Sequence, residues 1–243
     1  CHRFYDRWYA PDQAVLVLAG DLDIDRVLPI IEQRYGGLTP SKTQETTTIQ
    51  PVVDAQRSHV DLKTNTATER LVLGFRGPSA TASDNAALQV LNDILFGGDS
   101  GRLQRALVTE HELAVSAYGY VATLREHGAY EVGVDLRPTC RVEDAEALII
   151  EALGEIAMHG VTAKELAKAH NRIETRFYRA LQTAQAKAQA LGYWEIVAGD
   201  SSFLFERARQ LRSVGMDDIR NVAARWLDVT RYASVYGRPA HVR

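Results

Sequence analysis

The sequence contains few cysteines, no long apolar run and no excess of charge of one sign. Its two cysteines among 243 residues, Cys1 and Cys140, are too few for a disulfide framework or a cysteine-based metal site. No apolar run approaches the roughly 20 residues of a membrane span, and residues 1–15 lack the apolar core of a signal peptide. The net charge of −3, without a block of lysine or arginine, argues against nucleic acid as a partner.

What is present indicates a folded protein. Hydrophobic residues make up 46% of the chain and charged residues 24%, which excludes intrinsic disorder. At roughly 100 to 200 residues per domain, the length predicts one large domain, or one domain and part of another. The chain begins without methionine and inside a predicted helix, because Phe4, Trp8 and Tyr9 form an apolar stripe. We therefore expect a fragment of a longer protein with any targeting signal upstream, and the sequence leaves the localisation unknown.

The first 40 residues predict a strand followed by a helix. Residues 14–19 form a short, continuous apolar run, which is typical of a strand buried on both faces. Asp23 or Asp25 can cap the helix that follows, and Gly36 can end it. The apolar side of this helix consists of Val27, Ile30, Ile31 and Tyr35.

A stretch rich in threonine, serine and proline follows, and the rest of the chain predicts one complete unit. Residues 39–51 have little apolar content and are typical of a linker. We expect a first segment over residues 1–40, a linker over 41–56 and a second segment over 57–243. Predicted strands lie near residues 60–62, 71–75, 114–122, 129–136 and 232–236, and predicted helices near 81–96, 101–110, 142–159, 162–190 and 219–226.

The order of these elements predicts an α+β fold. Capping-box motifs at residues 81–84 and 162–165 mark the starts of two of the helices. Too few strand–helix–strand units are present for a doubly wound parallel sheet. An antiparallel or mixed sheet with helices packed on one face fits the order better.

The residues alone give no self-sufficient active site. None of the seven histidines has a second histidine three or four positions away, so no helical face offers two imidazoles to a metal. The cluster Glu110-His111-Glu112 is either a metal site or, as we prefer, a solvated helix end, because adjacent helical residues point about 100° apart. Ser100, in a glycine-rich loop, could attract an anion, but without the P-loop spacing and lysine a bare turn is favoured.

Three arginines lie at helical spacing on one face of a predicted helix. Arg172, Arg176 and Arg179 form a charged stripe, which is usually a solvated face. The alternative is a surface that steers a peptide or protein. The sequence does not assign the role of this stripe.

Several short stretches follow one another along the chain in a recognisable order. They are Phe4-Tyr5-Asp6-Arg7-Trp8-Tyr9-Ala10-Pro11 with Gly20-Asp21-Leu22-Asp23, then Phe75-Arg76-Gly77-Pro78, Ser100-Gly101-Arg102-Leu103 and Gly160-Val161-Thr162-Ala163-Lys164-Glu165-Leu166. Together, from end to end and in this order, they resemble pitrilysin-type zinc peptidases, the family that includes insulin-degrading enzymes and mitochondrial processing peptidase.

The resemblance implies a zinc metalloendopeptidase that cleaves peptides or proteins in a chamber between two clamshell halves. In that family, zinc is held by an H-x-x-E-H motif and a more distant glutamate, all upstream of the segment that resembles residues 4–23. The resemblance therefore assigns residues 1–40 to the tail of the catalytic-type half-domain and 57–243 to a second, non-catalytic half-domain. It implies zinc in the full-length parent and no catalytic or metal residue in this chain, which should be inactive alone. It also implies a partner half or subunit, with a dimer expected.

One departure from the family concerns its substrate-binding pair. Relatives that contact substrate from the zinc-less side use an arginine and a tyrosine in L-R-x-x-x-x-G-L-x-Y. Here Val108 stands at the arginine position, Val115 at the tyrosine position and Glu112 at the glycine position. Valine side chains cannot donate a hydrogen bond to a developing oxyanion, so this half-domain is not expected to complete a site by itself.

Two other interpretations remain open. The parent could be a structural or assembly subunit that has lost its zinc site, and a zinc motif ahead of Cys1 would exclude that. The chain could also be an unrelated α+β binding domain. Bacterial relatives of the peptidase type are often exported, which is compatible with the periplasm.

Overall fold

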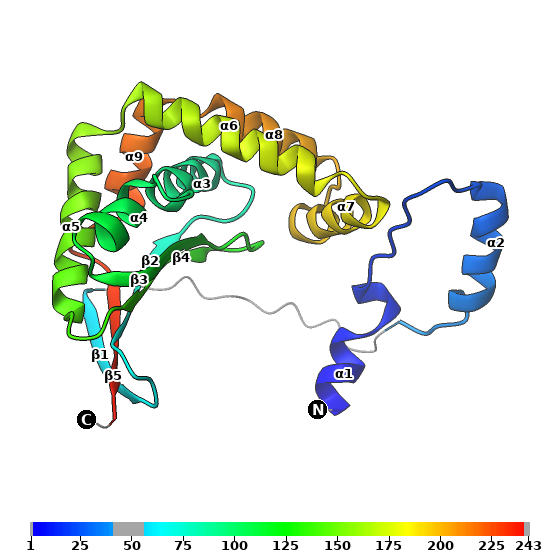
Figure 1. Cartoon of the computed structure of the whole chain (residues 1–243). Coiled ribbons are helices and arrows are strands. Elements are labelled where there is room, and N and C mark those ends of the chain that lie inside the picture. Colours follow the sequence, from blue (N-terminus) through cyan, green and yellow to red (C-terminus); the bar gives the residue numbers. More distant parts are fainter. Residues whose placement is uncertain (1, 41–55, 241–243) are drawn as a thin grey trace. The chain divides into compact units, whose positions relative to one another are not determined.

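A computed structural model describes residues 2–40 and 56–240 of the chain. These residues form two compact units, which are described separately (Figure 1). The larger unit consists of residues 56–177 and 205–240, and the smaller one of residues 2–40 and 178–204. Within the described ranges, no helix is both long and apolar enough to cross a bilayer.

The larger unit is built on one five-stranded mixed sheet. Its strand order is β1-β5-β2-β4-β3, in which β1 pairs with β5 in parallel and the other neighbours are antiparallel. The predicted strands are thus confirmed. Most of their predicted ends lie within one or two residues of the observed ends. The strands are β1 (Ser58–Thr64), β2 (Arg70–Gly77), β3 (Ala114–Val121), β4 (Gly128–Leu136) and β5 (Ala233–Pro239).

Helices cover one face of this sheet. Figure 1 shows α3, α5 and α9 side by side along that face, and the predicted α+β class is confirmed. Alternate residues of β2 and β4, such as Leu73 and Val132, are buried against these helices in a single apolar core. The helices that lie wholly or mostly in this unit are α3 (Ser83–Phe96), α4 (Arg102–Gln104), η2 (Arg105–Glu110), α5 (Val142–His159), α6 (Ala163–Ala180), α8 (Phe203–Ser213) and α9 (Met216–Trp226).

One of the two predicted capping boxes is present. The Thr162 hydroxyl accepts from the Glu165 N–H at 3.3 Å, and a Glu165 carboxylate oxygen accepts from the Thr162 N–H at 2.9 Å. The box predicted at residues 81–84 is wrong, because α3 begins at Ser83 after Ala82 without a side-chain cap. The Asp84 carboxylate accepts instead from the indole N–H of Trp226 at 2.7 Å.

The long helix predicted over residues 162–190 is interrupted. α6 ends at Ala180, and α7 (Ala184–Ala198) begins after Thr183, whose hydroxyl accepts from the Ala186 N–H at 3.1 Å. A threonine cap starts a new helix without any glycine or proline, which is why the apolar stripe alone did not predict the break. Helix α8 was not predicted either.

The smaller unit contains short helices joined by irregular chain. They are α1 (His2–Trp8), η1 (Pro11–Gln13) and α2 (Ile24–Tyr35), together with α7. Helix α2 begins as predicted, since the Asp23 carboxylate accepts from the Asp25 N–H at 3.1 Å. Apart from Gln56, the predicted linker over 41–56 lies outside the described residues.

The strand predicted at residues 14–19 is wrong. In the described chain this segment forms no strand, and Val15, Leu16 and Leu18 are exposed. It approaches α7 at one point, where a β-carbon on Gly192 would lie 3.1 Å from Val17. A strand requires a neighbouring strand to accept its hydrogen bonds, and none lies beside this segment in the described ranges.

Candidate functional site

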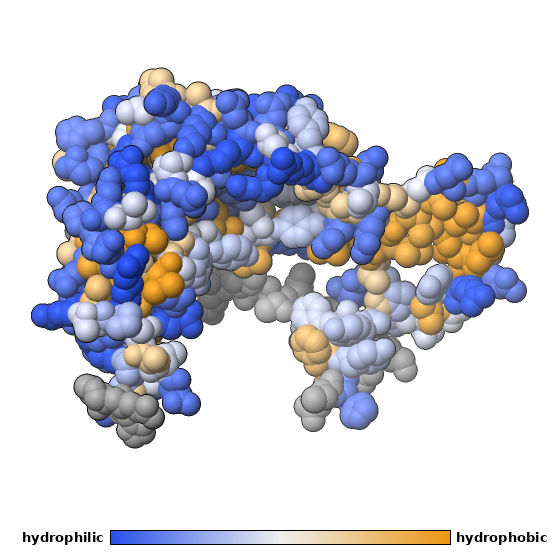
Figure 2. Space-filling model, viewed as in Figure 1, coloured by the Kyte–Doolittle hydropathy of each residue, from blue (hydrophilic) through white to orange (hydrophobic). Residues whose placement is uncertain are grey.

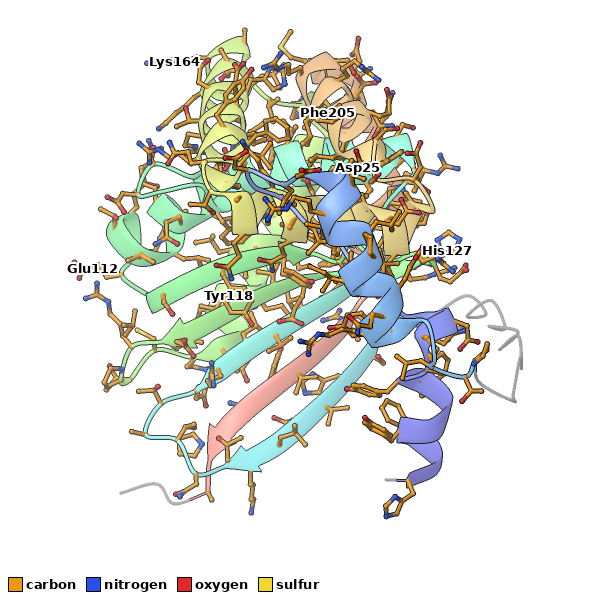
Figure 3. The ribbon with its side chains drawn as sticks, turned by 90° about the vertical axis from the view of Figure 1, so that its right-hand side faces the viewer. Asp25, Glu112, Tyr118, His127, Lys164 and Phe205 are labelled. Carbon is orange, nitrogen blue, oxygen red and sulfur yellow. The ribbon has the colours of Figure 1, made fainter. Side chains whose placement is uncertain are left out.

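In the described part of the larger unit, the face of the sheet opposite α3, α5 and α9 is covered by none of that unit's helices. Figure 3 views this face, with Tyr118 labelled on it. The strand registers place Tyr118 opposite Gly133, and Gly133 next to Val72 of β2. Residues on this side are exposed or half-buried for the most part, whereas their neighbours along each strand belong to the core. The face is therefore a surface available to a ligand or a second protein.

Two tyrosines of strand β3 lie on this face. Tyr118 and Tyr120 are both exposed. The Tyr118 hydroxyl donates to a carboxylate oxygen of Glu131 at 2.8 Å, and its ring lies over Gly133, where a β-carbon would collide with it. The hydrogen bond to the Glu131 carboxylate, with partial burial, raises the pKa of Tyr118. Tyr118 therefore stays a neutral donor and is held flat on the sheet.

Two further charged residues of the face are paired with each other. Arg70 contacts Asp135 at 2.5 Å, and the Ser116 hydroxyl donates to the second oxygen of Asp135 at 2.9 Å. Such exposed pairs orient the side chains and contribute little stability. The face can hold a ligand by apolar contact and hydroxyl groups, but this arrangement contains no activated nucleophile or general base.

Val108 and Val115, the positions that match the family's arginine and tyrosine, lie in different environments. Val108, in η2, is half-buried against the core, whereas Val115 is 64% exposed at a bulge near the start of β3. Arg137 joins the two segments: its guanidinium donates to the Val108 carbonyl at 3.3 Å and to the Ala114 carbonyl at 3.2 Å. The valines therefore add apolar surface and no side-chain hydrogen bond.

The acidic cluster around His111 does not fit a zinc site. Glu110 pairs with Arg105 at 2.9 Å, and His111 and Glu112 are exposed at the junction between η2 and β3. Across residues 2–40 and 56–240, no group of three or more histidine, cysteine, aspartate or glutamate side chains could hold a metal ion.

Glu112 has a backbone conformation that explains the glycine of the related motif. Its φ is 51°, in the left-handed region that favours glycine. At this position the chain therefore carries a glutamate side chain, although the conformation of the turn into β3 favours glycine.

One hydrogen-bonded chain resembles a catalytic triad and was missed by sequence reasoning. His59 Nδ1 lies 2.9 Å from the Ser234 hydroxyl and His59 Nε2 lies 3.0 Å from the Asp61 carboxylate. Ser234 is 1% exposed, so no substrate can reach its oxygen. Arg238, followed by His59, lowers the pKa of Asp61. This series of hydrogen bonds connects β1 to β5 and has a structural role.

Two of the three arginines of the predicted stripe take part in an ion-pair cluster around a buried carboxylate. Arg172 and Arg176 of α6 contact the two carboxylate oxygens of Asp93 at 2.8 and 2.9 Å, and the Asp93 side chain is 3% exposed. The solvated-face interpretation is wrong for Arg172, whose side chain is 26% exposed, whereas the side chain of Arg176 is 69% exposed and Arg179 is also exposed. Ser100 is exposed as well and accepts a hydrogen bond from Lys168. Both features therefore connect α6 to the end of α3.

Comparisons with known proteins agree with this architecture. The family model described as "Peptidase M16 inactive domain" matches residues 2–173. An "uncharacterized zinc protease" of Streptomyces coelicolor is 26% identical over 226 residues, which cover 91% of this chain and 49% of the relative. The chain spans about half the length of the curated relatives it matches.

Two solved structures have the same fold. A protease from Helicobacter pylori has a TM-score of 0.86 and 21% identity, over 98% of this chain and 58% of that one. The peptidase M16 inactive domain from Pseudomonas fluorescens has a TM-score of 0.75 and 20% identity, over 92% of this chain and 53% of that one.

The family resemblance predicted from the sequence is confirmed by the match over residues 2–173, which is most of the chain. That match includes α1, α2 and the sheet from β1 to β4. The chain belongs to the peptidase M16 inactive domain family.

Proposed function

We propose that this chain is the C-terminal, non-catalytic portion of a zinc-dependent metalloendopeptidase that cleaves peptides or proteins in a chamber between two halves. The family match supports the peptidase assignment, and the half-length coverage of zinc proteases leaves room for a zinc-bearing half. In this proposal zinc and its ligands belong to the parent outside this chain, and the chain alone is inactive.

The observation that carries the proposal is the unpartnered apolar segment in the smaller unit. Residues 14–19 have the composition of a buried strand but no strand partner in the described chain. Helix α2, which follows, has no fully buried residue. Both features are accounted for if residues 1–40 complete the sheet and core of a preceding half-domain, while 41–56 link it to a second half-domain over 57–243.

The uncovered face of the sheet is the part of this chain that we assign to the chamber wall. Tyr118 and Tyr120 offer two aromatic surfaces and hydroxyl groups to an extended peptide. Val115 lies on the same strand and offers apolar contact alone. The chain would thus contribute to holding the substrate, while the polarisation of the scissile bond would come from the partner half.

Zinc analysis of the complete gene product, with the 243-residue chain as the blank, tests this proposal. We expect about one zinc per parent chain and none in the 243-residue chain, together with peptidase activity that a chelator abolishes. No zinc in either protein would contradict the peptidase assignment and favour a structural or assembly subunit. Zinc in the 243-residue chain would contradict the placement of the metal site upstream.

A pair of substitutions provides a second test within this chain. Val108→Arg with Val115→Tyr restores the two side chains of the related motif, and we expect no peptidase activity from the 243-residue chain that carries them. The reason is that donors to an oxyanion cannot act without the metal and base. Zinc-dependent cleavage by this double variant would contradict the proposal.

A further inference from the structure

One edge strand of the sheet has no neighbour on its outer side. In the strand order β1 pairs with β5 alone, and no other strand of the described residues lies beside it. Figure 3 shows β1 at the lower edge of the sheet, and residues 58–63 of this strand are all exposed. The tyrosines assigned to the chamber wall lie on β3, at the opposite edge. The outer edge of β1 is therefore a separate surface, to which a further strand can bind.

The pairing with β5 shows which backbone groups of β1 remain available. The Ser58 N–H donates to the Tyr232 carbonyl at 3.1 Å, so the backbone of Ser58 is directed toward β5. Alternate residues of a strand direct their N–H and C=O groups to opposite sides. His59, Asp61 and Lys63 therefore direct theirs away from β5, toward the open edge.

The side chains of β1 carry opposite charges two positions apart. Asp61 contacts Arg238 at 2.8 Å and His59 at 3.0 Å, and its side chain is still 56% exposed. Lys63 is exposed and forms no ion pair within the described part of the chain. Leu62 lies on the other face of the strand and is 49% exposed. The strand thus offers an acidic, an apolar and a basic side chain to a neighbouring strand.

We propose that β1 pairs with β1 of a second copy of this chain, antiparallel, about a two-fold axis between the two Leu62 residues. In this register Asp61 lies opposite the partner's Lys63, and Lys63 lies opposite the partner's Asp61. Each of these pairs exchanges two backbone hydrogen bonds, because the groups of both residues point outward. The two Leu62 side chains meet at the axis as a non-hydrogen-bonded pair, in which side chains lie closest. The two five-stranded sheets become one continuous sheet.

Charge selects this register over the neighbouring ones. A shift of the partner by two residues in one direction places Asp61 opposite the partner's Asp61. The same shift in the other direction places Lys63 opposite the partner's Lys63. Like charges directly opposite each other in a sheet are destabilising, whereas opposite charges are favourable. A shift by one residue is excluded, because it would direct the free backbone groups of one copy at residues that bond to β5 in the other.

A second copy matches this edge better than an unrelated strand does. Any extended segment could add backbone hydrogen bonds to β1. A segment that also matches the side chains has an acidic, an apolar and a basic residue in succession, and β1 itself has them as Asp61-Leu62-Lys63. The two-fold axis repeats each contact, so that both ion pairs form in one interface. Because the interface is small, we expect a dimer Kd of about 10 to 100 µM.

Disulfide trapping in a matched pair of variants tests the register. In a chain with Cys1 and Cys140 replaced by serine, Leu62→Cys places two thiols at the axis, within the Cα separation of disulfides. Val60→Cys is the control, because Val60 lies on the same face and is 47% exposed, against 49% for Leu62. In the proposed register the two copies of residue 60 are about 13 Å apart along the strands, too far for a disulfide.

Under mild oxidation, at a protein concentration above the expected Kd, we expect Leu62→Cys to form a covalent dimer in high yield. Val60→Cys should form about tenfold less, because its thiols meet only in random collisions. A comparable yield from both variants would show association through another surface, such as the apolar surface of the smaller unit, and would overturn the proposal. The absence of a covalent dimer from Leu62→Cys would overturn it as well.

Charge-reversal variants test the ion pairs. Lys63→Glu faces the partner's Asp61 with a like charge, and we expect it to raise the dimer Kd about tenfold in sedimentation equilibrium. Lys164→Glu, the same change on an exposed lysine of α6, should leave Kd unchanged. An equal mixture of Lys63→Glu and Asp61→Lys should form a heterodimer, because each acidic residue again lies opposite a lysine. Equal effects of the two lysine variants, or a mixture of two folded variants that stays monomeric, would overturn the proposal.

Discussion

The two units of this chain differ in how far their apolar residues are buried. In the larger unit the apolar residues of β2, β4, α3 and α5 form one buried core. In the described part of the smaller unit, the buried hydrophobic residues are Ala10, Trp194 and Leu204, and Ile24 of α2 is 74% exposed. Figure 2 shows the resulting broad hydrophobic surface over α2.

This difference shows which elements form from local sequence signals and which depend on tertiary contacts. Helix α2 has its own start signal in Asp23 and forms without burying any side chain completely. Residues 14–19 cannot form their structure from local signals alone, because a strand depends on a partner strand for its hydrogen bonds. A contiguous apolar surface of this kind marks an interaction site in a soluble protein. The smaller unit therefore exposes an apolar surface that, in our proposal, the preceding half-domain of the parent covers.

The largest expected effect comes from a substitution in the core of the larger unit. Leu153→Ala on α5 removes a fully buried side chain, and we expect it to lower the free energy of unfolding by about 2 to 5 kcal/mol. Urea unfolding monitored by circular dichroism measures this change. A loss of less than about 1 kcal/mol would mean that the larger unit is not held by the core described here.

A smaller loss is expected from the ion-pair cluster that joins α6 to α3. Asp93→Ala leaves Arg172 and Arg176 without their shared carboxylate. We expect a cost of about 2 kcal/mol, below that of a fully buried pair because both arginines are partly in water. The exposed Asp99, in the loop after the same helix, provides the control, and Asp99→Ala should change stability by less than about 0.5 kcal/mol. Similar costs for the two variants would contradict the structural role of Asp93.

A gain is expected at the turn before β3. Glu112→Gly relieves a left-handed backbone conformation, and we expect it to raise the free energy of unfolding by about 0.5 to 1 kcal/mol. Glu110→Gly, two positions earlier in η2, should instead destabilise the chain. If Glu112→Gly is destabilising as well, the conformation of this turn is not the one described.

The smallest effect in this chain is expected in the smaller unit, where it sharpens the contrast. Ile30→Ala on α2 removes an exposed side chain, so we expect a change within about 0.5 kcal/mol in the 243-residue chain. In the complete gene product the same substitution should cost more than about 1.5 kcal/mol, because the side chain would be buried by the preceding half-domain. Equal and small costs in both proteins would argue against that burial.

Periodic apolar patterns predicted most of the larger unit. The alternation of Leu71, Leu73 and Phe75, and of the corresponding residues in β4, indicated which strands form and which face is buried. The reciprocal hydrogen bonds between Thr162 and Glu165 could also be predicted from the sequence, because the two residues lie within one helical turn. These features depend on neighbours in the sequence.

Contacts between distant residues could not be predicted in this way. Asp93 and Arg172 are 79 positions apart, and Glu146 accepts from Tyr232, 86 positions away, at 2.7 Å. Nothing local marks such pairs as partners. The environments of Val108 and Val115 likewise depend on how η2 meets β3. The apolar run at 14–19 was misread for a related reason, because its composition predicts burial without indicating where the partner lies.

Hydrogen exchange of residues 14–19, compared between the 243-residue chain and the complete gene product, tests the central claim most directly. The account predicts rapid exchange of these amides in the 243-residue chain and exchange slowed more than about 1000-fold in the gene product, where they would pair with a strand of the preceding half-domain. The amides of β4 should be protected in both proteins and provide the internal reference. Equal, rapid exchange of residues 14–19 in both proteins would contradict the claim that this segment belongs to the sheet of another half-domain.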